Sequence, residues 1–408
     1  MIGGDLIVDN IGELVTNDER AGDRLGLARG ATVLILDGKV AFAGPSGNLP
    51  QGAVSREMEH LDARGALCTP GLVEPHAHPI FAGSRAHEFD LRARGRSYGE
   101  IQAAGGGILA TVRATRAAGD EELIASTCAR LDRFLANGVT VVEAKTGYDL
   151  TVEGELRLLR LLGEVRARHA VDVSPTLLAH VPPPASEADR ADYVRQFAAT
   201  AIPAAARAGC EAVDVYCDAG AFTVEETRTI LAAGRAAGLA LRAHAEQFTR
   251  TGVAELAASL GARSVEHLEE YGEGAPAALA RAGTVCNLLP GAALTLKLRW
   301  PDARRLLDAG CHVALGTDCN PGSSLTESLP LMMSLACMQL GMTCEEAWRG
   351  VTVEAARAVG RPDAGRLTAG ARGDLVLWDA ADHREVVQHY GVPLARTVVV
   401  GGRVIVRG

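Results

Sequence analysis

The sequence lacks an excess of basic residues. Its 408 residues include 41 Lys and Arg against 50 Asp and Glu, which gives a formal net charge of -9. Proteins that bind nucleic acid or anionic lipid through electrostatics usually present clustered positive charge. We therefore expect no nucleic-acid partner and no membrane partner. A hydrophobic share of 48% is nevertheless sufficient for a large folded core, which excludes a disordered chain.

A long apolar run is also missing. The longest uncharged stretch, residues 328–344, has 17 residues and contains Ser, Pro, Gln and Gly, so it predicts a buried helix and not a membrane span. Residues 1–15 carry acids and glycines where a secretory peptide would have a basic start and an apolar centre. We expect a chain that is not exported.

No cysteine pattern typical of disulfides or metal sites is present. The nine cysteines are odd in number, and none forms a C-x-x-C pair. A disulfide framework is therefore disfavoured, and reduced thiols acting as small core residues fit better. The expected location is the cytoplasm.

What the sequence does contain is a repeating alternation between about residues 70 and 320. Short β-branched runs alternate with segments rich in Ala, Leu and Arg, such as 121–137, 151–169, 224–237 and 251–261. Eight runs are predicted strands: 71–78, 139–148, 171–180, 212–222, 239–247, 263–269, 284–291 and 312–320. Eight strand–helix units favour an α/β fold in which a (β/α)8 barrel of the TIM type is closed.

The two ends of the chain have a different pattern. They read as short strands with tight turns such as Asp37-Gly38, at residues 5–15, 31–42, 58–67, 374–378 and 397–406. We expect the N- and C-terminal segments to pair into one small β-sandwich domain. The predicted limits are residues 1–68 and 359–408 for the sandwich and 69–358 for the barrel.

Polar residues gather at the carboxyl ends of the predicted strands, the rim where barrels of this kind carry their active sites. They are His76, His78, Tyr148, His180, His244, Gln247, His267, Asp318 and Asn320. The other histidines, at positions 60, 87, 169, 312, 383 and 389, lack this placement and are expected to be surface or ordinary core residues.

Four of the strand-end residues have the chemistry of a metal site. His76 and His78 stand two positions apart in an extended segment, so both imidazoles point the same way. With His244 and Asp318 they form a nitrogen and oxygen set that suits Zn or Fe at about 2.0 to 2.2 Å, with a position left for water. An isolated His-x-His pair is more often a surface turn, but its combination with two further strand ends favours a metal centre.

At these residues the chain resembles a known superfamily. Residues 69–78 (TPGLVEPHAH), with His244, His267 and Asp318, are similar to the metal-dependent amidohydrolases, which combine a (β/α)8 barrel with a small β-sandwich built from both termini. Finer matches resemble the imidazolonepropionase family: 98–116 (YGEIQAAGGGILATVRATR), 145–148 (KTGY), 213–222 (VDVYCDAGAF), 244–247 (HAEQ), 265–268 (VEHL) and 317–324 (TDCNPGSS). The implied activity is the hydrolytic ring opening of 4-imidazolone-5-propanoate to N-formimidoyl-L-glutamate in histidine degradation.

The resemblance also implies a set of roles around one metal ion. His76, His78, His244 and Asp318 would hold one Zn or Fe ion per subunit, because residues 212–222 lack the lysine that binuclear relatives carboxylate on the fourth strand. Asp318 would in addition carry a proton from water to the leaving nitrogen. His267 would orient that water or polarise the carbonyl, the alternative being a histidine that only packs beside the ligands.

Substrate-binding residues are implied in the same way. Arg85 would bind the propanoate group of this small-molecule substrate. Tyr148, His180 and Gln247 would bind the substrate, Asn320, Gly322 and Ser323 would line the product site, and Tyr98 is a further candidate. Lys145 would be structural or contact the ligands from outside, and the family assembles as a homodimer.

Two departures and two alternatives qualify this interpretation. Residues 178–184 (LAHVPPP) are one position shorter than the family pattern around His180, and Gln247 stands where some relatives have Glu, so it can bind but not act as a base. A purine or pyrimidine deaminase would use much the same metal set, and a scaffold that has lost its metal is the other alternative. The Gly105–Gly107 triplet lacks a following Lys-Ser/Thr, so a mobile lid or tight turn is expected there, not a phosphate loop.

Overall fold

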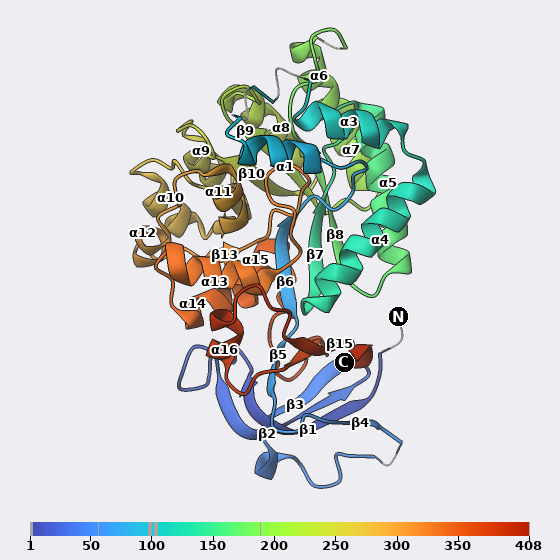
Figure 1. The fold of residues 1–408 in the computed structure, drawn as a ribbon, viewed down its shortest axis with the longest axis vertical. Helices are drawn as coiled ribbons and strands as arrows, with labels where there is room; N and C mark the ends of the chain where they lie inside the picture. Colours follow the sequence, from blue (N-terminus) through green and yellow to red (C-terminus); the bar gives the residue numbers. More distant parts are fainter. Residues whose placement is uncertain (1–2, 56, 97–99, 102–104, 188, 408) are drawn as a thin grey trace.

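The computed structural model describes residues 3–407 except 56, 97–99, 102–104 and 188 (Figure 1). The upper part in Figure 1 is a ring of parallel strands surrounded by helices, and the lower part is a mixed sheet that holds both ends of the chain. The fold class expected from the sequence, a TIM-like barrel with a small β-sandwich domain from both termini, is confirmed as a barrel with a separate mixed sheet built from both termini.

All eight predicted barrel strands are present. They run in spatial order β6 to β13, each parallel to its neighbour: β6 (Leu72–Ala77), β7 (Val139–Lys145), β8 (Asp172–Ala179), β9 (Ala212–Cys217), β10 (Ala240–Ala245), β11 (Ser264–His267), β12 (Val285–Leu288) and β13 (Val313–Leu315). The ring closes where the chain leaving β13 meets β6. There Asp318 N–H donates to the His76 carbonyl at 3.0 Å, and His78 N–H donates to the Cys319 carbonyl at 3.0 Å.

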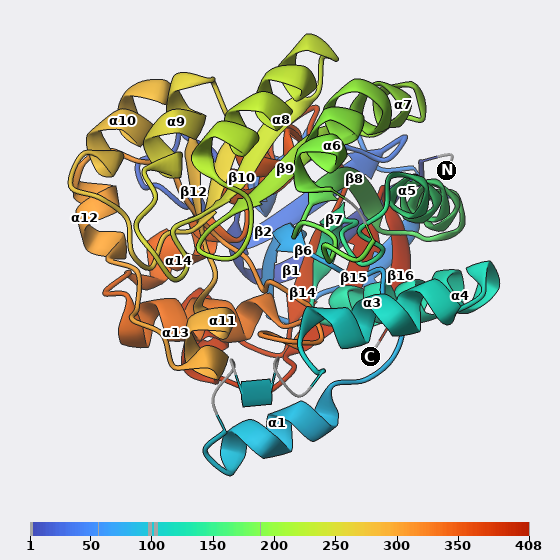
Figure 2. The same ribbon diagram turned by 90° about the horizontal axis from the view of Figure 1, so that it is seen from above.

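Helices form the outer layer of the barrel (Figure 2). They are α1 (Ala86–Ala93), α3 (Ile108–Ala117), α4 (Asp120–Ala136), α5 (Val152–Arg168), α6 (Arg190–Gln196), α7 (Ile202–Arg207), α8 (Val224–Ala236), α9 (Val253–Ser259), α10 (Ala275–Ala282), α11 (Pro290–Leu296), α12 (Ala303–Asp308), α13 (Leu329–Gln339), α14 (Cys344–Gly350), α15 (Val353–Val359) and α16 (His383–Gln388). Helix α5 is typical: the Thr151 hydroxyl accepts from Gly154 N–H at its start, and leucines at 158, 161 and 162 are buried on one face.

The predicted uncharged helix within residues 328–344 is also confirmed, as α13, whose buried side includes Met332 and Met333. Among the described residues, no helix is both long enough and apolar enough to cross a lipid bilayer. The nine cysteines are free thiols, and six of them are buried.

The terminal strands form one continuous mixed sheet. In spatial order it contains β16 (Arg403–Arg407), β15 (Ala395–Val400), β14 (Leu375–Trp378), β5 (Leu67–Pro70), β1 (Leu6–Val15), β2 (Leu27–Leu36) and β3 (Lys39–Pro45), with β4 (Glu59–Asp62) paired to β1. The predicted run 31–42 is divided into β2 and β3 by the two-residue turn Asp37-Gly38, where both φ angles are positive, +49° and +73°. The predicted domain limits stay a prediction.

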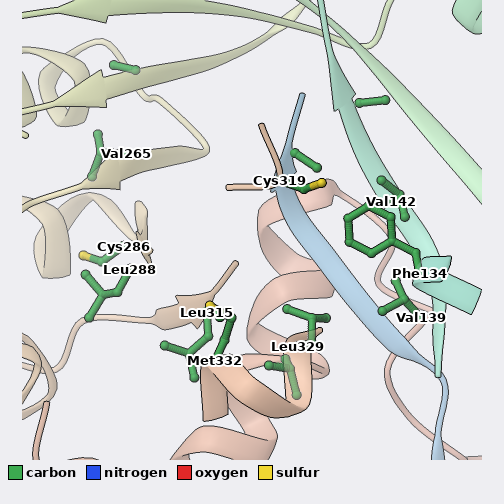
Figure 3. Packing of buried hydrophobic residues seen from close by; sticks show 14 of the residues in the cluster. Phe134, Val139, Val142, Val265, Cys286, Leu288, Leu315, Cys319, Leu329 and Met332 are labelled. Atoms are coloured by element: carbon green, nitrogen blue, oxygen red, sulfur yellow. The ribbon is translucent and has the colours of Figure 1, made fainter. Parts of the chain in front are cut away.

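A shared core joins the sheet to the barrel. Barrel strands and outer helices pack side chains such as Phe134, Val142 and Leu315 between them (Figure 3). At the junction, the rings of Trp348 and Trp378 meet edge to face with centroids 5.8 Å apart. Their indole nitrogens donate to His383 O and Thr69 Oγ1. The sheet therefore supports the closed amino-terminal end of the barrel, and the opposite rim is left for chemistry.

Candidate active site

A cavity of about 320 Å³ opens at the carboxyl ends of the barrel strands. Most of the residues selected from the sequence line it: His78, Arg85, Tyr148, His180, His244, Gln247, His267, Asp318, Asn320, Gly322 and Ser323. His76 lies beneath them and is fully buried. Tyr98 falls outside the described residues. The cavity also has the size and the mixed apolar and polar wall of a small-molecule site.

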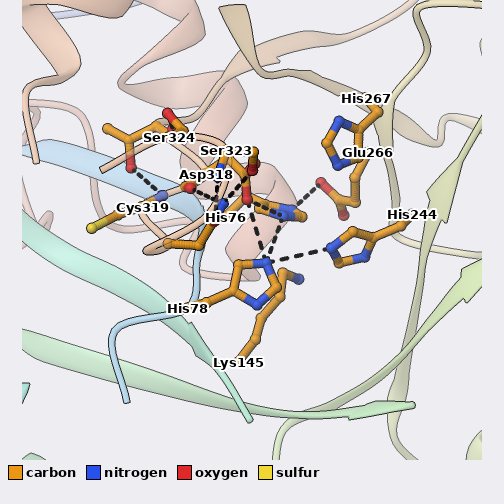
Figure 4. Close-up of polar contacts among 12 residues, drawn as sticks. His76, His78, Lys145, His244, Glu266, His267, Asp318, Cys319, Ser323 and Ser324 are labelled. Atoms are coloured by element: carbon orange, nitrogen blue, oxygen red, sulfur yellow. Dashed lines mark hydrogen bonds and ion pairs between the residues drawn. The ribbon is translucent and has the colours of Figure 1, made fainter. Parts of the chain in front are cut away.

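Four donor atoms converge at the floor of this cavity (Figure 4). His78 Nε2 lies 3.3 Å from His76 Nε2 and 3.4 Å from His244 Nε2. Asp318 Oδ1 lies 3.5 Å from His76 Nε2 and 3.4 Å from His78 Nε2. A tetrahedral ion with ligands at about 2.1 Å places them about 3.4 Å apart, so these four separations are those expected around a zinc-type ion. His76, His78 and Asp318 form one group that could hold a metal ion, and His76, His244 and His267 form an overlapping one.

Carboxylates orient the imidazoles from the opposite side. His76 Nδ1 lies 3.2 Å from Glu266 Oε2, His244 Nδ1 lies 3.0 Å from Asp214 Oδ2, and His267 Nδ1 lies 3.5 Å from Glu269 Oε1. Because a carboxylate can only accept, it favours a proton on Nδ1 and leaves the Nε2 lone pair facing the centre. None of these three carboxylates was selected from the sequence, since each is one of many acidic residues until the fold is known.

The electrostatic field at the centre is negative. Burial and the Lys145 charge both lower the pKa of His76, yet contacts with Asp318 and Glu266 outweigh them and raise it to about 9. Burial raises the pKa of Asp318, but its contacts with His76 and His78 hold it well below its usual value. A buried group of acceptors that attracts a proton this strongly is also suited to a cation.

Unusual backbone conformations concentrate at this rim. Glu246, His267, Leu268 and Asp318 have φ angles of +58°, +76°, +66° and +53°, in a region that residues other than glycine rarely occupy. Such conformations cost of order 1 kcal/mol or more each and are retained where the surroundings require them. Here they turn His267, the last residue of β11, and Asp318, in the loop after β13, inward.

His180 is held as a neutral hydrogen-bond acceptor. Its Nδ1 donates to the Gly147 carbonyl at 2.9 Å, and burial lowers its pKa to about 3. The ring stacks on His78 with centroids 5.4 Å apart. The shortened segment after residue 178 therefore does not remove His180 from the cavity wall.

Arg85 is buried next to the cavity, paired with a carboxylate that the sequence did not single out. Its Nε and Nη2 donate to Glu88 Oε2 at 3.0 and 2.7 Å. A Cβ on Gly322 would lie 2.2 Å from Arg85 Nη1, so glycine is what allows the guanidinium to approach this loop. The other Glu88 oxygen accepts from Gly107 N–H at 3.1 Å, which places the glycine triplet in a turn at the start of α3.

The loop after β13 is ordered by Asn320. Its Oδ1 accepts from Gly322 N–H and Ser323 N–H, both at 2.8 Å. The Ser323 hydroxyl in turn donates to Asp318 Oδ2 at 3.1 Å, so the loop holds the candidate proton carrier.

Gln247 Oε1 accepts from Tyr216 O–H at 3.0 Å. Tyr216 also lines the cavity and was not selected, although it lies at a strand end as Tyr148 does.

The chain is similar over nearly its whole length to curated proteins of one kind. It is 45% identical to the imidazolonepropionase of Myxococcus xanthus over 410 residues, which cover 99% of this chain and 97% of that protein. Its identity to the imidazolonepropionase of Rubrobacter xylanophilus is 46%, with 93% and 91% covered. Residues 218–405 match the model of the amidohydrolase family.

Solved structures share the fold at low identity. The atrazine chlorohydrolase of Arthrobacter aurescens complexed with zinc superimposes with a TM-score of 0.70 at 17% identity, over 98% of this chain and 95% of that one. An adenosine deaminase from Xanthomonas campestris with bound zinc gives 0.73 at 16% identity, over 99% and 93%. These similarities establish a common architecture.

Proposed function

Because the chain belongs to the imidazolonepropionase family of the amidohydrolase superfamily, we propose that its cavity hydrolyses 4-imidazolone-5-propanoate to N-formimidoyl-L-glutamate. The protein is a hydrolase that opens a cyclic amide. The observation that carries the site assignment is the close approach of His76, His78, His244 and Asp318 beside a cavity of suitable size.

The four convergent residues would hold one Zn or Fe ion. Such an ion, when bound, makes water a better nucleophile at neutral pH and stabilises negative charge on a carbonyl oxygen. The donor set, three imidazole nitrogens and one carboxylate oxygen, supports a metal of this class.

Asp318 is placed to move the proton that hydrolysis requires. Its Oδ1 faces the centre, and the Ser323 hydroxyl holds Oδ2. We assign it to accept a proton from the attacking water and to return it to the ring nitrogen as the carbon–nitrogen bond breaks. His267, turned inward by its positive φ angle, would orient the water or polarise the carbonyl.

The remaining groups would bind and orient the substrate. The Arg85 guanidinium would bind the propanoate by a charge-assisted interaction. His180 presents an acceptor to a ring N–H, and Tyr148, Gln247 and the 320–323 loop line the space around the ring. The donor and acceptor pattern around the cavity supports a polar heterocycle with an acidic side arm.

The Asp318→Asn variant tests this assignment. Because it removes a proton carrier and weakens a ligand together, we expect kcat to fall by at least ~10³-fold. Loss of the ultraviolet absorbance of freshly prepared 4-imidazolone-5-propanoate measures the rate. Asp308→Asn, an exposed aspartate on α12 paired with Arg304, is the matched control and should retain activity.

Full activity of Asp318→Asn would refute the role given to Asp318. Release of free ammonia from a cyclic amidine base, without ring opening, would instead support a deaminase.

We also propose a homodimer in the cytoplasm, as expected for the family, and the nine unpaired thiols support a reducing compartment. Light scattering of the purified protein measures its oligomeric state.

A further inference from the structure

A buried lysine lies directly behind the candidate metal centre. Lys145, the last residue of β7, is fully buried, and its ammonium donates to Glu143 Oε1 at 2.9 Å and to Asp214 Oδ2 at 2.7 Å. Figure 4 includes Lys145 in the close-up of the residues around the centre. An ammonium in the interior of a barrel is costly to desolvate, so a well-formed pair of carboxylate partners is required to keep it there.

The same Asp214 oxygen that binds Lys145 also faces a candidate ligand. Asp214 Oδ2 lies 3.0 Å from His244 Nδ1, on the ring edge opposite to the Nε2 that points at the centre. Lys145 on β7, Asp214 on β9 and His244 on β10 thus form a chain of side-chain contacts in the barrel interior. A shift of the Asp214 carboxylate would be transmitted to the His244 ring, since both groups are closely packed in the barrel interior.

A second chain of contacts leads from Arg242 through Ser264 and Glu266 to His76. Arg242 on β10 is fully buried, with Nε 3.6 Å from Glu143 Oε1 and Nη1 donating to Ser264 Oγ at 2.9 Å. The Ser264 hydroxyl donates to Glu266 at 2.5 Å, and the other Glu266 oxygen faces His76. Two buried cations therefore hold the two carboxylates that contact two of the candidate ligands.

Buried carboxylates outnumber buried basic side chains around the centre. Among the described residues of this network, Glu143, Asp214, Glu266, Glu269 and Asp318 supply carboxylates, and Lys145 and Arg242 are the basic side chains beside them. Such an interior is suited to a cation, and Lys145 pairs with the carboxylate behind His244.

We propose that Lys145 is a positioning residue that acts through Asp214 to fix the His244 imidazole in its ligand orientation, and so strengthens metal binding. The inference rests on the metal site proposed above. Its physical basis is that a carboxylate held by a fixed ammonium cannot rotate away from the imidazole, and such outer contacts commonly change metal affinity by about 10- to 100-fold.

The test compares Lys145→Met with a matched surface variant. Methionine keeps an unbranched side chain of similar length and removes the charge. Lys297→Met, at an exposed position in a chain with three lysines, is the control. Competition with a chelating dye measures the Zn²⁺ dissociation constant, and the visible spectrum after loading with Co²⁺ reports the ligand geometry. We expect Lys145→Met to bind Zn²⁺ about 10- to 100-fold more weakly with an altered Co²⁺ spectrum, and the control to match the wild type.

A double-mutant cycle separates action through Asp214 from general destabilisation. If Lys145 acts through Asp214, Asp214→Asn weakens binding by itself, and Lys145→Met adds little to it. Additive losses, or wild-type affinity and spectrum in Lys145→Met, would overturn the proposal. Should Lys145→Met fail to fold, Lys145→Gln and Asp214→Asn carry the same comparison. A wild-type protein that binds neither Zn²⁺ nor Co²⁺ would instead remove the metal site itself.

Discussion

Single residues at the cavity are held by contacts that sequence patterns do not encode. The histidines at strand ends were recognisable because their spacing and position are local features. Tyr216, Glu88 and Asp214 were not recognisable, since the role of a tyrosine or a carboxylate depends on which groups lie next to it in the folded protein. The contact between His76 and Glu266, for example, joins residues 190 positions apart.

Gly147 shows how one backbone position constrains a side chain of the cavity wall. Its φ angle is +114°, and a Cβ there would lie 2.9 Å from Leu178 Cδ2 and 3.1 Å from His180 Nδ1. We expect Gly147→Ala to displace the His180 ring and to raise KM by ~10-fold or more, because an interaction worth about 1 to 2 kcal/mol is lost. Steady-state kinetics measures the effect.

The matched control for this prediction is Gly163→Ala on α5. A Cβ at this position would meet no atom within 4 Å, and alanine favours helix over glycine by up to about 1 kcal/mol. This variant should keep the wild-type KM and unfold at the same or a higher temperature. An unchanged KM in Gly147→Ala would contradict the role given to His180.

At the scale of elements, the eight barrel strands lie where the sequence predicted them, because a buried strand is encoded by a short run of β-branched residues. Of the helices between β6 and β7, α4 was expected at residues 121–137, but α1 and α3 were not anticipated. Helix α1 (Ala86–Ala93) has Glu88 as its buried residue and leaves Phe89 exposed, so it lacks the buried apolar stripe by which a helix is recognised. Its position depends on specific polar contacts.

Glu88 is the contact that joins α1 to α3. Its carboxylate binds the Arg85 guanidinium and the Gly107 N–H at the start of α3, where the helix dipole favours negative charge. We expect Glu88→Ala to loosen both helices and to leave Arg85 poorly oriented. KM should rise by about 10-fold with kcat changed less than about threefold, since a charged hydrogen bond contributes about 1.5 to 3 kcal/mol.

Hydrogen exchange gives a second measurement of the same change. Amides of residues 86–93 and 108–117 should exchange faster in Glu88→Ala than in the wild type, because local opening becomes less costly. Asp90→Asn, on the same helix with its side chain exposed and paired to Arg94, should change neither KM nor exchange across residues 108–117. Equal behaviour of the two variants would show that Glu88 does not orient Arg85.

At the scale of the whole molecule, an ion-pair group joins the barrel to the terminal sheet. Asp172 at the start of β8 binds both Arg361 Nε at 3.0 Å and Arg372 Nη1 at 2.9 Å. Arg361 also reaches Glu211, and Arg372 reaches Asp374 beside β14. Burial raises the pKa of Asp172 and of Glu211, but Arg361 outweighs it and lowers both below their usual values.

These lowered pKa values predict a pH-dependent stability. A carboxylate whose pKa is lower in the folded state contributes stability above its unfolded pKa of about 4, and that contribution is lost as the pH falls through the folded value. Arg361→Gln should therefore be less stable than the wild type at pH 7, and the gap should narrow as the pH falls below about 4. Urea unfolding at a series of pH values measures it.

Arg94→Gln is the control, because Arg94 and Asp90 are exposed and such pairs contribute little. Its unfolding free energy should follow that of the wild type at every pH. A gap for Arg361→Gln that stays constant from pH 7 to pH 3 would show that the pairing with Asp172 and Glu211 does not stabilise the fold.

The sequence by itself determined the barrel, the terminal sheet and the histidines and aspartate of the candidate metal centre. Hydrophobic periodicity is a local property, and parallel strands necessarily bring their carboxyl ends to one rim. Only the tertiary structure decided which carboxylate stands behind each imidazole and how Arg85 is held. Those partners lie in the barrel interior or on short polar helices, where the choice among many similar acidic residues depends on packing in three dimensions.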